Sequence, residues 1–292
     1  MGESSDRKPT LQDGLIGLLE SGCIPWRPRW RVRAVGERHL NLFSGTAYGG
    51  ADPLLLEVAT VQRRTPLPWW CTYAEAKAAG LSPRRGAGGI RLGLASSRAN
   101  HRQRVRVVFN VADLVGPTLQ RALAQRRRAL RASRATEQQR LLAAENQLRH
   151  WPVRIREGRH LPGYRIAADQ IFLPCRHTFH CREAFLARWA REQIRSTWHP
   201  GRLRWEGEER NRCTVAPKEF VIELTWILLA DRLGLGVEDG PFVLTEADWI
   251  QMLQPSPDRF LELLTTAGKL MELLAPATAP VRGSADKLLA LV

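Results

Sequence analysis

Residues 69–80 read WWCTYAEAKAAG, a short apolar run that leads directly into a small helix predicted over residues 73–79. Two segments further along the chain, residues 90–94 and 105–110, alternate between apolar and polar side chains in the manner of paired β-strands. This mixture of strands and helix predicts an α+β fold for the first part of the chain.

Leucines at helical spacing predict two further helices before this stretch, one over residues 10–22, ended by Gly22, and one over residues 53–61. Between them, the sequence NLFSGTAYGG at residues 41–50 is rich in turn-forming residues. We therefore predict one α+β unit over residues 10–116.

Residues 117–150 change in composition to Ala, Leu, Gln and Arg, and they include the run Arg126-Arg127-Arg128. This composition predicts a basic helical linker. A solvated spacer helix accounts for it, and so does a basic arm that follows the phosphates of a nucleic acid. Of these two interpretations, the sequence favours the spacer.

Residues 151–274 are expected to form a second, mostly helical unit, and residues 275–292 a flexible tail. The sequence YRIAADQIFLP at residues 164–174 predicts short strands around a turn. Longer segments with apolar residues at helical spacing predict helices over residues 181–198, 219–233, 248–253 and 258–274.

The charge balance points to a polyanionic partner. The 292 residues contain 44 Lys and Arg against 29 Asp and Glu, a net charge of +15, and nearly all the positive side chains are Arg. Arg makes bidentate contacts to phosphate and stacks on bases, so nucleic acid is a better match than an anionic membrane surface. No apolar run is long enough to cross a membrane, and the polar N-terminus predicts no signal peptide.

Five scattered cysteines are typical of reduced thiols in a cytoplasmic protein, which is the location we expect. Four potential zinc ligands do lie close together, namely Cys175, His177, His180 and Cys181. A structural zinc site normally takes its ligands from two separate pairs, so we predict no metal here while leaving this cluster as an open alternative.

Aromatic rings and arginines interleave in the first unit, which is what binding of single-stranded DNA requires. Cations follow the phosphates, and exposed rings stack on bases of any sequence at roughly 1–3 kcal/mol each. We expect Trp26 and Trp30 to be exposed, and one of Trp69 and Trp70 to belong to the core. The predicted DNA-binding residues are Trp26, Arg27, Arg29, Trp30, Arg31, Asn41, Tyr48, Trp70, Tyr73, Arg84 and Arg85.

Six stretches of the first unit together form a recognisable pattern. They are PWRPRW (25–30), NLFSGTAYGG (41–50), the leucine-rich helix at 54–56, WCTYAEAKAAG (70–80), the glycine turn at 86–89 and VFNVADLVG (108–116). With these motifs the first unit resembles the N-terminal single-stranded DNA-binding domain of the ArdC-type antirestriction proteins, which conjugative plasmids encode. The motifs occur in the family's order and with nearly its spacing.

The second unit resembles the family's zincin-like metallopeptidase domain. The lead-in Tyr-x-x-x-x-Asp-x-Ile-x-Leu-Pro is matched at residues 164–174, and the later His-Pro-x-Arg-Leu landmark at residues 199–203. The resemblance places Arg191 and Arg195 where the family's H-E-x-x-H motif has its histidines. It likewise makes Glu192 the counterpart of the general base, and Glu223 the counterpart of the third zinc ligand.

Two arginines in place of two histidines decide what this motif can do. A histidine pair at i and i+4 offers two neutral nitrogens to zinc, whereas a guanidinium has no lone pair to donate and stays charged. We therefore predict no metal, no cofactor and no peptidase activity, with an Arg–Glu network in the metal's place. The alternative is an active zinc metallopeptidase with displaced ligands.

The resemblance implies a plasmid-borne protein that binds single-stranded DNA of any sequence and shields incoming DNA from restriction. An alternative function is fertility inhibition, in which the protein blocks the transfer of a co-resident plasmid. The expected partners are single-stranded DNA and, in either case, conjugation or restriction proteins. No membrane insertion is expected.

Overall fold

The apolar run at the start of the opening motif forms β2 (Trp69–Thr72), an inner strand of a four-stranded sheet with the order β1-β2-β5-β4. Helix α4 (Tyr73–Ala78) follows at once because Thr72 and Glu75 cap it reciprocally, each side chain accepting from the other's backbone N–H. The expected strand pair is confirmed, since β4 and β5 are antiparallel neighbours. The other strands of the first unit are β1 (Leu40–Asn41), β4 (Ile90–Leu92), β5 (Arg106–Asn110) and the pair β3 (Ser82–Pro83) and β6 (Leu114–Val115).

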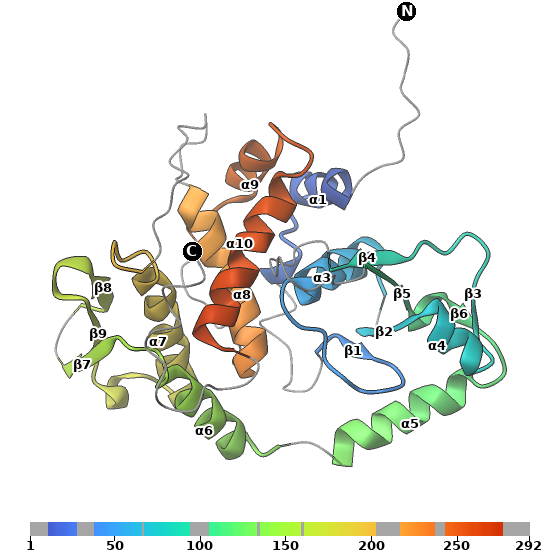
Figure 1. Cartoon of the computed structure of the whole chain (residues 1–292), viewed down its shortest axis with the longest axis horizontal. Coiled ribbons are helices and arrows are strands. Elements are labelled where there is room, and N and C mark those ends of the chain that lie inside the picture. The colour runs from blue at the N-terminus through green and yellow to red at the C-terminus, as the bar shows by residue number, and fades with distance from the viewer. Residues whose placement is uncertain are drawn as a thin grey trace, which may run out of the picture.

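The computed structural model describes residues 11–27, 38–65, 67–93, 105–132, 135–158, 161–202, 217–236 and 243–276. In Figure 1, two long helices, α8 (Pro217–Leu233) and α10 (Arg259–Leu274), lie in the middle of the molecule. The four-stranded sheet lies on one side of them, and the sheet of the second unit lies on the other (Figure 1). The expected α+β architecture is therefore the one observed.

The first helix, α1 (Leu11–Glu20), packs against the second unit as well as against α3 (Asp52–Gln62). The side-chain amide of Gln12 donates to the carbonyl oxygens of Leu253 (2.7 Å) and Ser256 (2.6 Å), and its own oxygen accepts from the backbone N–H of Phe260. One hydrophobic core consequently runs through both units. The two units are less separate than their sequences predict.

The basic linker forms two helices, α5 (Leu119–Ala132) and α6 (Glu137–Leu148), and each packs on a different unit. Leu123 of α5 is buried in the smaller core of the first unit, whereas α6 contacts α7 and α8 of the second. The linker is thus not a bare spacer, because one face of α5 is fixed to the first unit.

The second unit combines a small sheet with a helical layer. Strand β9 (Gln170–Pro174) lies between the parallel β7 (Arg154–Gly158) and the antiparallel β8 (Gly163–Arg165). The helices are α7 (Arg182–Ser196), α8, α9 (Glu246–Leu253) and α10. Helix α8 is buried on nearly every side, in accord with its almost continuous apolar sequence. Among the described residues, no helix is long and apolar enough to span a bilayer.

Candidate functional site

Helix α7 presents three charged side chains within and just before the expected metal motif. Arg188, Glu192 and Arg195 follow each other at i, i+4 and i+7, which places them on one helix face. The side chain of Glu192 is 0 % exposed, and its Oε1 lies 2.9 Å from a guanidinium nitrogen of both arginines. Its other oxygen accepts from the backbone N–H of Tyr164 at 2.9 Å. Every oxygen of this carboxylate is therefore already engaged.

The second carboxylate, Glu223 of α8, is held by residues from the first unit. Its side chain is 5 % exposed. Trp26 donates its indole N–H to Oε1 at 2.9 Å, and Arg27 donates to both oxygens at 3.1 and 2.9 Å. Burial raises the pKa of Glu223, and the Arg27 guanidinium acts in the opposite direction.

Arg191 lies near both carboxylates. Its guanidinium carbon is 5.9 Å from the centre of the Trp226 ring. Burial lowers the pKa of Arg191, and so does the proximity of Arg195 and Arg188, whereas the charge of each carboxylate acts to raise it. A cavity of about 20 Å³ lies beside Arg191, Arg195 and Glu223, which is room for about one water molecule.

The residues at this site do not fit the zinc of a metallopeptidase. Two of the three ligand positions carry guanidinium groups, which have no lone pair. The third, Glu223, already accepts three hydrogen bonds from Trp26 and Arg27. The predicted ion pair between Arg195 and Glu192 is confirmed, whereas the pairing of Glu223 with Arg27 was not foreseen, because it joins segments far apart in the sequence.

The two landmarks that flank this motif contact each other. Arg202, from the His-Pro-Gly-Arg-Leu stretch, donates to both oxygens of Asp169 at 2.7 and 2.6 Å. Tyr164, from the lead-in stretch, donates its hydroxyl to the same carboxylate at 2.7 Å. The hydrogen bond from Arg202 lowers the pKa of Asp169. These landmark residues therefore fasten the small sheet to the end of α7.

The Cys/His cluster before α7 is not assembled as a ligand set. The sulfur of Cys181 accepts from the backbone N–H of Ala184 and so caps α7. Within the described part of the chain, no three His, Cys, Asp or Glu side chains gather closely enough to share a metal ion.

Two of the tryptophans expected to bind DNA are core residues instead. Trp26 is 0 % exposed and packs edge-on against Trp249, with ring centroids 4.9 Å apart, and parallel to Phe260. The expected exposure of Trp26 is wrong because α1 and the segment after it fold onto the second unit. Trp70 is fully buried as well, and its indole N–H donates to His39 at 3.1 Å. Trp69 is buried beside it, so both members of that pair belong to the core.

Other predicted DNA-binding residues do lie at the surface. The Tyr73 side chain is 55 % exposed at the start of α4, and Arg84 and Arg85 are exposed in the turn after β3. Arg29, Trp30 and Arg31 lie outside the described residues. The binding role of these residues stays a prediction.

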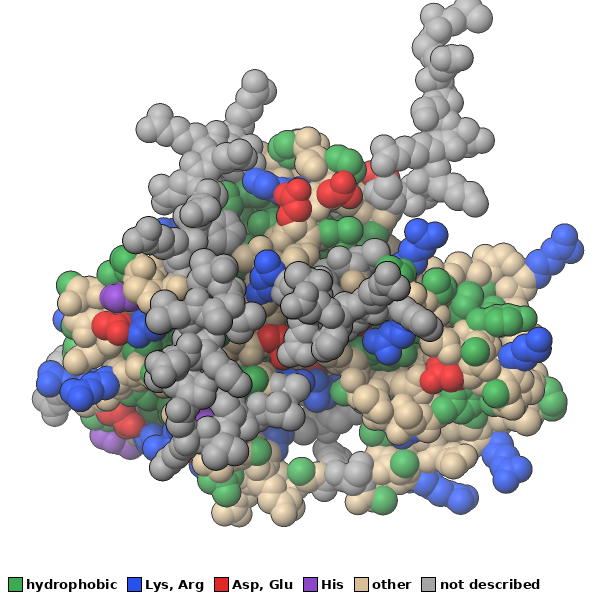
Figure 2. Space-filling view, viewed as in Figure 1, with side chains coloured by type: hydrophobic (Ala, Val, Ile, Leu, Met, Phe, Trp, Pro, Cys, Tyr) green, Lys and Arg blue, Asp and Glu red, His purple; other side chains and the backbone are tan. Residues whose placement is uncertain are grey.

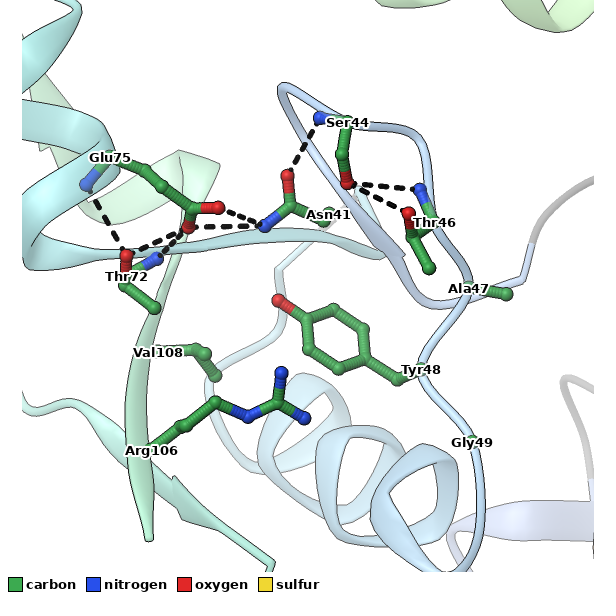
Figure 3. Close-up of a pocket in the computed structure, with 10 residues that line it drawn as sticks. All are labelled: Asn41, Ser44, Thr46, Ala47, Tyr48, Gly49, Thr72, Glu75, Arg106 and Val108. Carbon is green, nitrogen blue, oxygen red and sulfur yellow. Dashed lines mark hydrogen bonds between the residues drawn. The ribbon is translucent and has the colours of Figure 1, made fainter. Parts of the chain in front are cut away.

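Asn41 and Tyr48 lie together in a pocket of about 270 Å³ in the first unit (Figure 3). Asn41 donates its side-chain amide to both oxygens of Glu75 at 2.9 and 3.1 Å. Arg106 of β5 extends beneath the Tyr48 ring (Figure 3), and Val108 of the same strand also lines the pocket. The sequence did not identify Glu75 and Arg106 as site residues, because only the fold brings their segments together.

A basic surface on α5 adjoins this unit. Three exposed arginines lie on the side of α5 turned away from buried Leu123, and within the described residues none of the three pairs with a carboxylate. Figure 2 shows Lys and Arg side chains projecting at the lower right of the molecule, where Figure 1 places α5. We call this surface the α5 arginine face; its members are Arg121, Arg128 and Arg131. Arg127 is not a member, because it lies one turn after Leu123 with its guanidinium 6.0 Å from the centre of the Trp69 ring.

Arg126, by contrast, points toward the pocket loop. It donates to the carbonyl oxygens of Leu42 (2.8 Å) and Phe43 (2.6 Å). The loop can accept this contact because residue 45 is glycine. Its φ is +76°, a conformation that favours glycine, and a Cβ at this position would clash with the Arg126 guanidinium. Helix α5 therefore fixes one wall of the pocket.

Comparison with known proteins agrees with this two-part organisation. Residues 6–139 match the family described as the N-terminal domain of anti-restriction factor ArdC, and residues 142–262 match the zincin-like metallopeptidase family. The chain is an ArdC-type protein. These two matched ranges cover the α5 arginine face, the pocket and the α7–α8 site of this ArdC-type chain.

Solved structures share the fold of this ArdC-type chain. The antirestriction protein ArdC from plasmid R388 has been crystallised with Mn(II) bound and metal-free. The two structures have TM-scores of 0.63 and 0.65 to this chain, each at 22 % identity; they cover 90 % and 92 % of it, and it covers 95 % and 96 % of them. DNA primase TraC of Escherichia coli is 27 % identical over 90 % of this chain and 26 % of TraC, so the chain spans about a quarter of that relative.

Proposed function

We propose that this protein binds single-stranded DNA of any sequence and acts in antirestriction, protecting or controlling DNA during plasmid transfer. The observation that carries the proposal is the α5 arginine face, whose exposed guanidinium groups have no carboxylate partner among the described residues. Unpaired surface arginines at close spacing attract a polyphosphate chain. The net charge of +15 and the family of the N-terminal unit point the same way.

Single strands are favoured over duplex DNA because the first unit offers a recess beside its basic face. A base must leave its stack to enter a pocket, and a single strand can present one at much lower cost than a duplex can. The exposed ring of Tyr73, next to the pocket residue Thr72, provides a surface for stacking a neighbouring base.

The zincin-like unit, on this proposal, cleaves no peptide. Catalysis in zincins needs a metal-bound water and a free carboxylate that takes its proton. Arg191 and Arg195 replace the nitrogen ligands, and the Glu192 carboxylate is committed to two arginines and a backbone N–H. We infer that the unit serves as a scaffold that holds Trp26 and α1, and with them the DNA-binding unit.

A nucleic-acid binding panel tests the proposal. Labelled single-stranded DNA, the same sequence as duplex, and RNA are titrated with protein at two salt concentrations. We expect the single strand to bind more tightly than the duplex, with affinity falling steeply as salt rises. Equal affinity for single strand and duplex at physiological salt would contradict the proposal.

A further inference from the structure

The pocket of the first unit has the size of a single ring-shaped group. Its volume of about 270 Å³ falls just under the range of roughly 300–1,000 Å³ typical of small-molecule sites. All ten residues that line it come from the first unit, between Asn41 and Val108. It therefore suits one part of a longer ligand, such as one base of a DNA strand.

Glu75 supplies a fixed acceptor at one end of this pocket. Its Oε2 accepts from the backbone N–H of Thr72 (2.7 Å), from the hydroxyl of Thr72 (2.8 Å) and from Asn41. Its Oε1 accepts from Asn41 at 2.9 Å and, within the described part of the chain, from no other donor. An ionised carboxylate has about four acceptor positions and no donor, so a position on Oε1 is open to one ligand N–H.

Tyr48 supplies a hydroxyl close to that acceptor. The ring is 7 % exposed, and Figure 3 shows the hydroxyl directed toward the space between Asn41 and Val108. Burial raises the pKa of Tyr48, so the phenol keeps its proton and can donate it in a hydrogen bond. The pocket therefore presents one acceptor and one donor side by side.

Arg106 gives the pocket an electropositive rim. Its side chain is 54 % exposed, and its nearest carboxylate oxygen, on Asp52, is 3.9 Å away. Such a distant, exposed pair leaves the guanidinium available to a phosphate. Figure 3 shows this guanidinium beneath the Tyr48 ring, on the side of the pocket away from Glu75.

We propose that this pocket receives one base of the bound single strand and prefers a base whose amino group adjoins an unprotonated ring nitrogen on the Watson–Crick edge, namely cytosine or adenine. The amino group donates to Glu75, the ring nitrogen accepts from Tyr48, and the adjoining phosphate contacts Arg106. Thymine and uracil present these groups in the reverse order and would bring a carbonyl oxygen against the carboxylate. The inference rests on the proposed function and adds one base-selective position to an otherwise unselective surface.

Oligo(dC) and oligo(dU) of equal length provide the direct test on the unaltered protein. The two pyrimidines differ only in the edge that the pocket would contact, and neither carries the methyl group of thymine. A hydrogen bond to a charged group predicts roughly tenfold tighter binding of oligo(dC) at the same pH and salt. Equal affinities overturn the base preference and leave the proposed function standing, whereas no binding of either oligomer overturns both.

Two conservative variants test whether Tyr48 and Glu75 cause the preference for oligo(dC) over oligo(dU). Tyr48→Phe keeps the buried ring and removes only the hydroxyl, and Glu75→Gln keeps an oxygen that can cap α4. Each should bring the ratio of oligo(dC) to oligo(dU) affinity close to one. The control, Arg106→Gln, should weaken both oligomers by the same factor. A preference that survives in Tyr48→Phe and Glu75→Gln overturns the assignment, and if Glu75→Gln melts early, Tyr48→Phe decides alone.

Discussion

Arg27 and Glu223 are separated by almost two hundred residues and form a bidentate ion pair, with nitrogen–oxygen distances of 3.1 and 2.9 Å. The pair connects the segment after α1 with the core helix α8. We expect Arg27→Ala to lower the free energy of unfolding by about 3 kcal/mol, because among the described residues it leaves this buried carboxylate with a single hydrogen-bond donor, Trp26. Chemical denaturation measures this directly.

The matched control for that variant is Arg259→Ala. Arg259 pairs with Glu262, whose side chain is 56 % exposed, so losing the pair should cost less than about 1 kcal/mol. Similar losses in the two variants would show that the Arg27–Glu223 pair is not a special link between the units.

Glu192→Gln should also destabilise the protein. The carboxylate is completely buried and neutralises Arg188 and Arg195, and an amide keeps its size but loses the charge. Since both arginines are partly exposed and can be solvated, we expect a loss of about 2–3 kcal/mol. Glu262→Gln, at an exposed helical pair, serves as control. An unchanged unfolding midpoint for Glu192→Gln would show that the ion pairs of Glu192 with Arg188 and Arg195 do not stabilise the protein.

Restoring the histidines tests the interpretation of the α7–α8 site. The double variant Arg191→His, Arg195→His recreates H-E-x-x-H, and zinc bound to the purified protein is measured by elemental analysis. We expect the double variant to bind zinc, and more tightly once Arg27→Ala releases Glu223. The wild type, purified without chelator, should carry none. Stoichiometric zinc in the wild type would contradict both the alignment and the loss of peptidase chemistry.

Lowering the pH should reduce the free energy of unfolding, because Glu145 becomes protonated. Burial by itself would raise the pKa of this carboxyl, but hydrogen bonds from Arg182, Arg149 and Arg176 prevail and lower it to about 2. Because the folded pKa lies below the ordinary value of 4.5, the stabilisation is complete above that pH and is lost as the pH falls toward 2. Unfolding free energies measured across this window should fall less steeply for Glu145→Gln. Parallel curves for the two proteins would contradict the assignment.

Local patterns predicted most of the secondary structure. The apolar run at β2, the alternation in β4 and β5, and the leucine spacing of α1 and α3 all depend on neighbouring residues, and each was predicted within a few positions. The short strand β7 was missed because its sequence, RIREG, has little apolar periodicity.

Contacts in the candidate sites could be predicted from the sequence only where the residues lie close together along the chain. The Arg–Glu contact within α7 follows from helical spacing, and Asn41 and Tyr48 stand in one motif. The burial of Trp26 depends on Trp249 and Phe260, more than two hundred residues later. Flanking prolines and arginines carry no information about such distant packing, so the expected exposure was wrong.

The salt dependence of single-strand affinity tests the central claim most directly, that the α5 arginine face binds phosphates. A triple Arg→Gln variant on α5 is compared with wild type and with an equally charged triple variant at exposed positions of the second unit's sheet. The α5 variant changes Arg121, Arg128 and Arg131, and the control changes Arg154, Arg156 and Arg165.

Each lost phosphate contact on a single strand reduces the log–log salt slope by about 0.7. We expect the α5 variant to bind more weakly than wild type, with a slope shallower by about 2, while the control keeps most of the wild-type affinity and slope. Equal slopes and affinities for the α5 variant and the control would contradict the account.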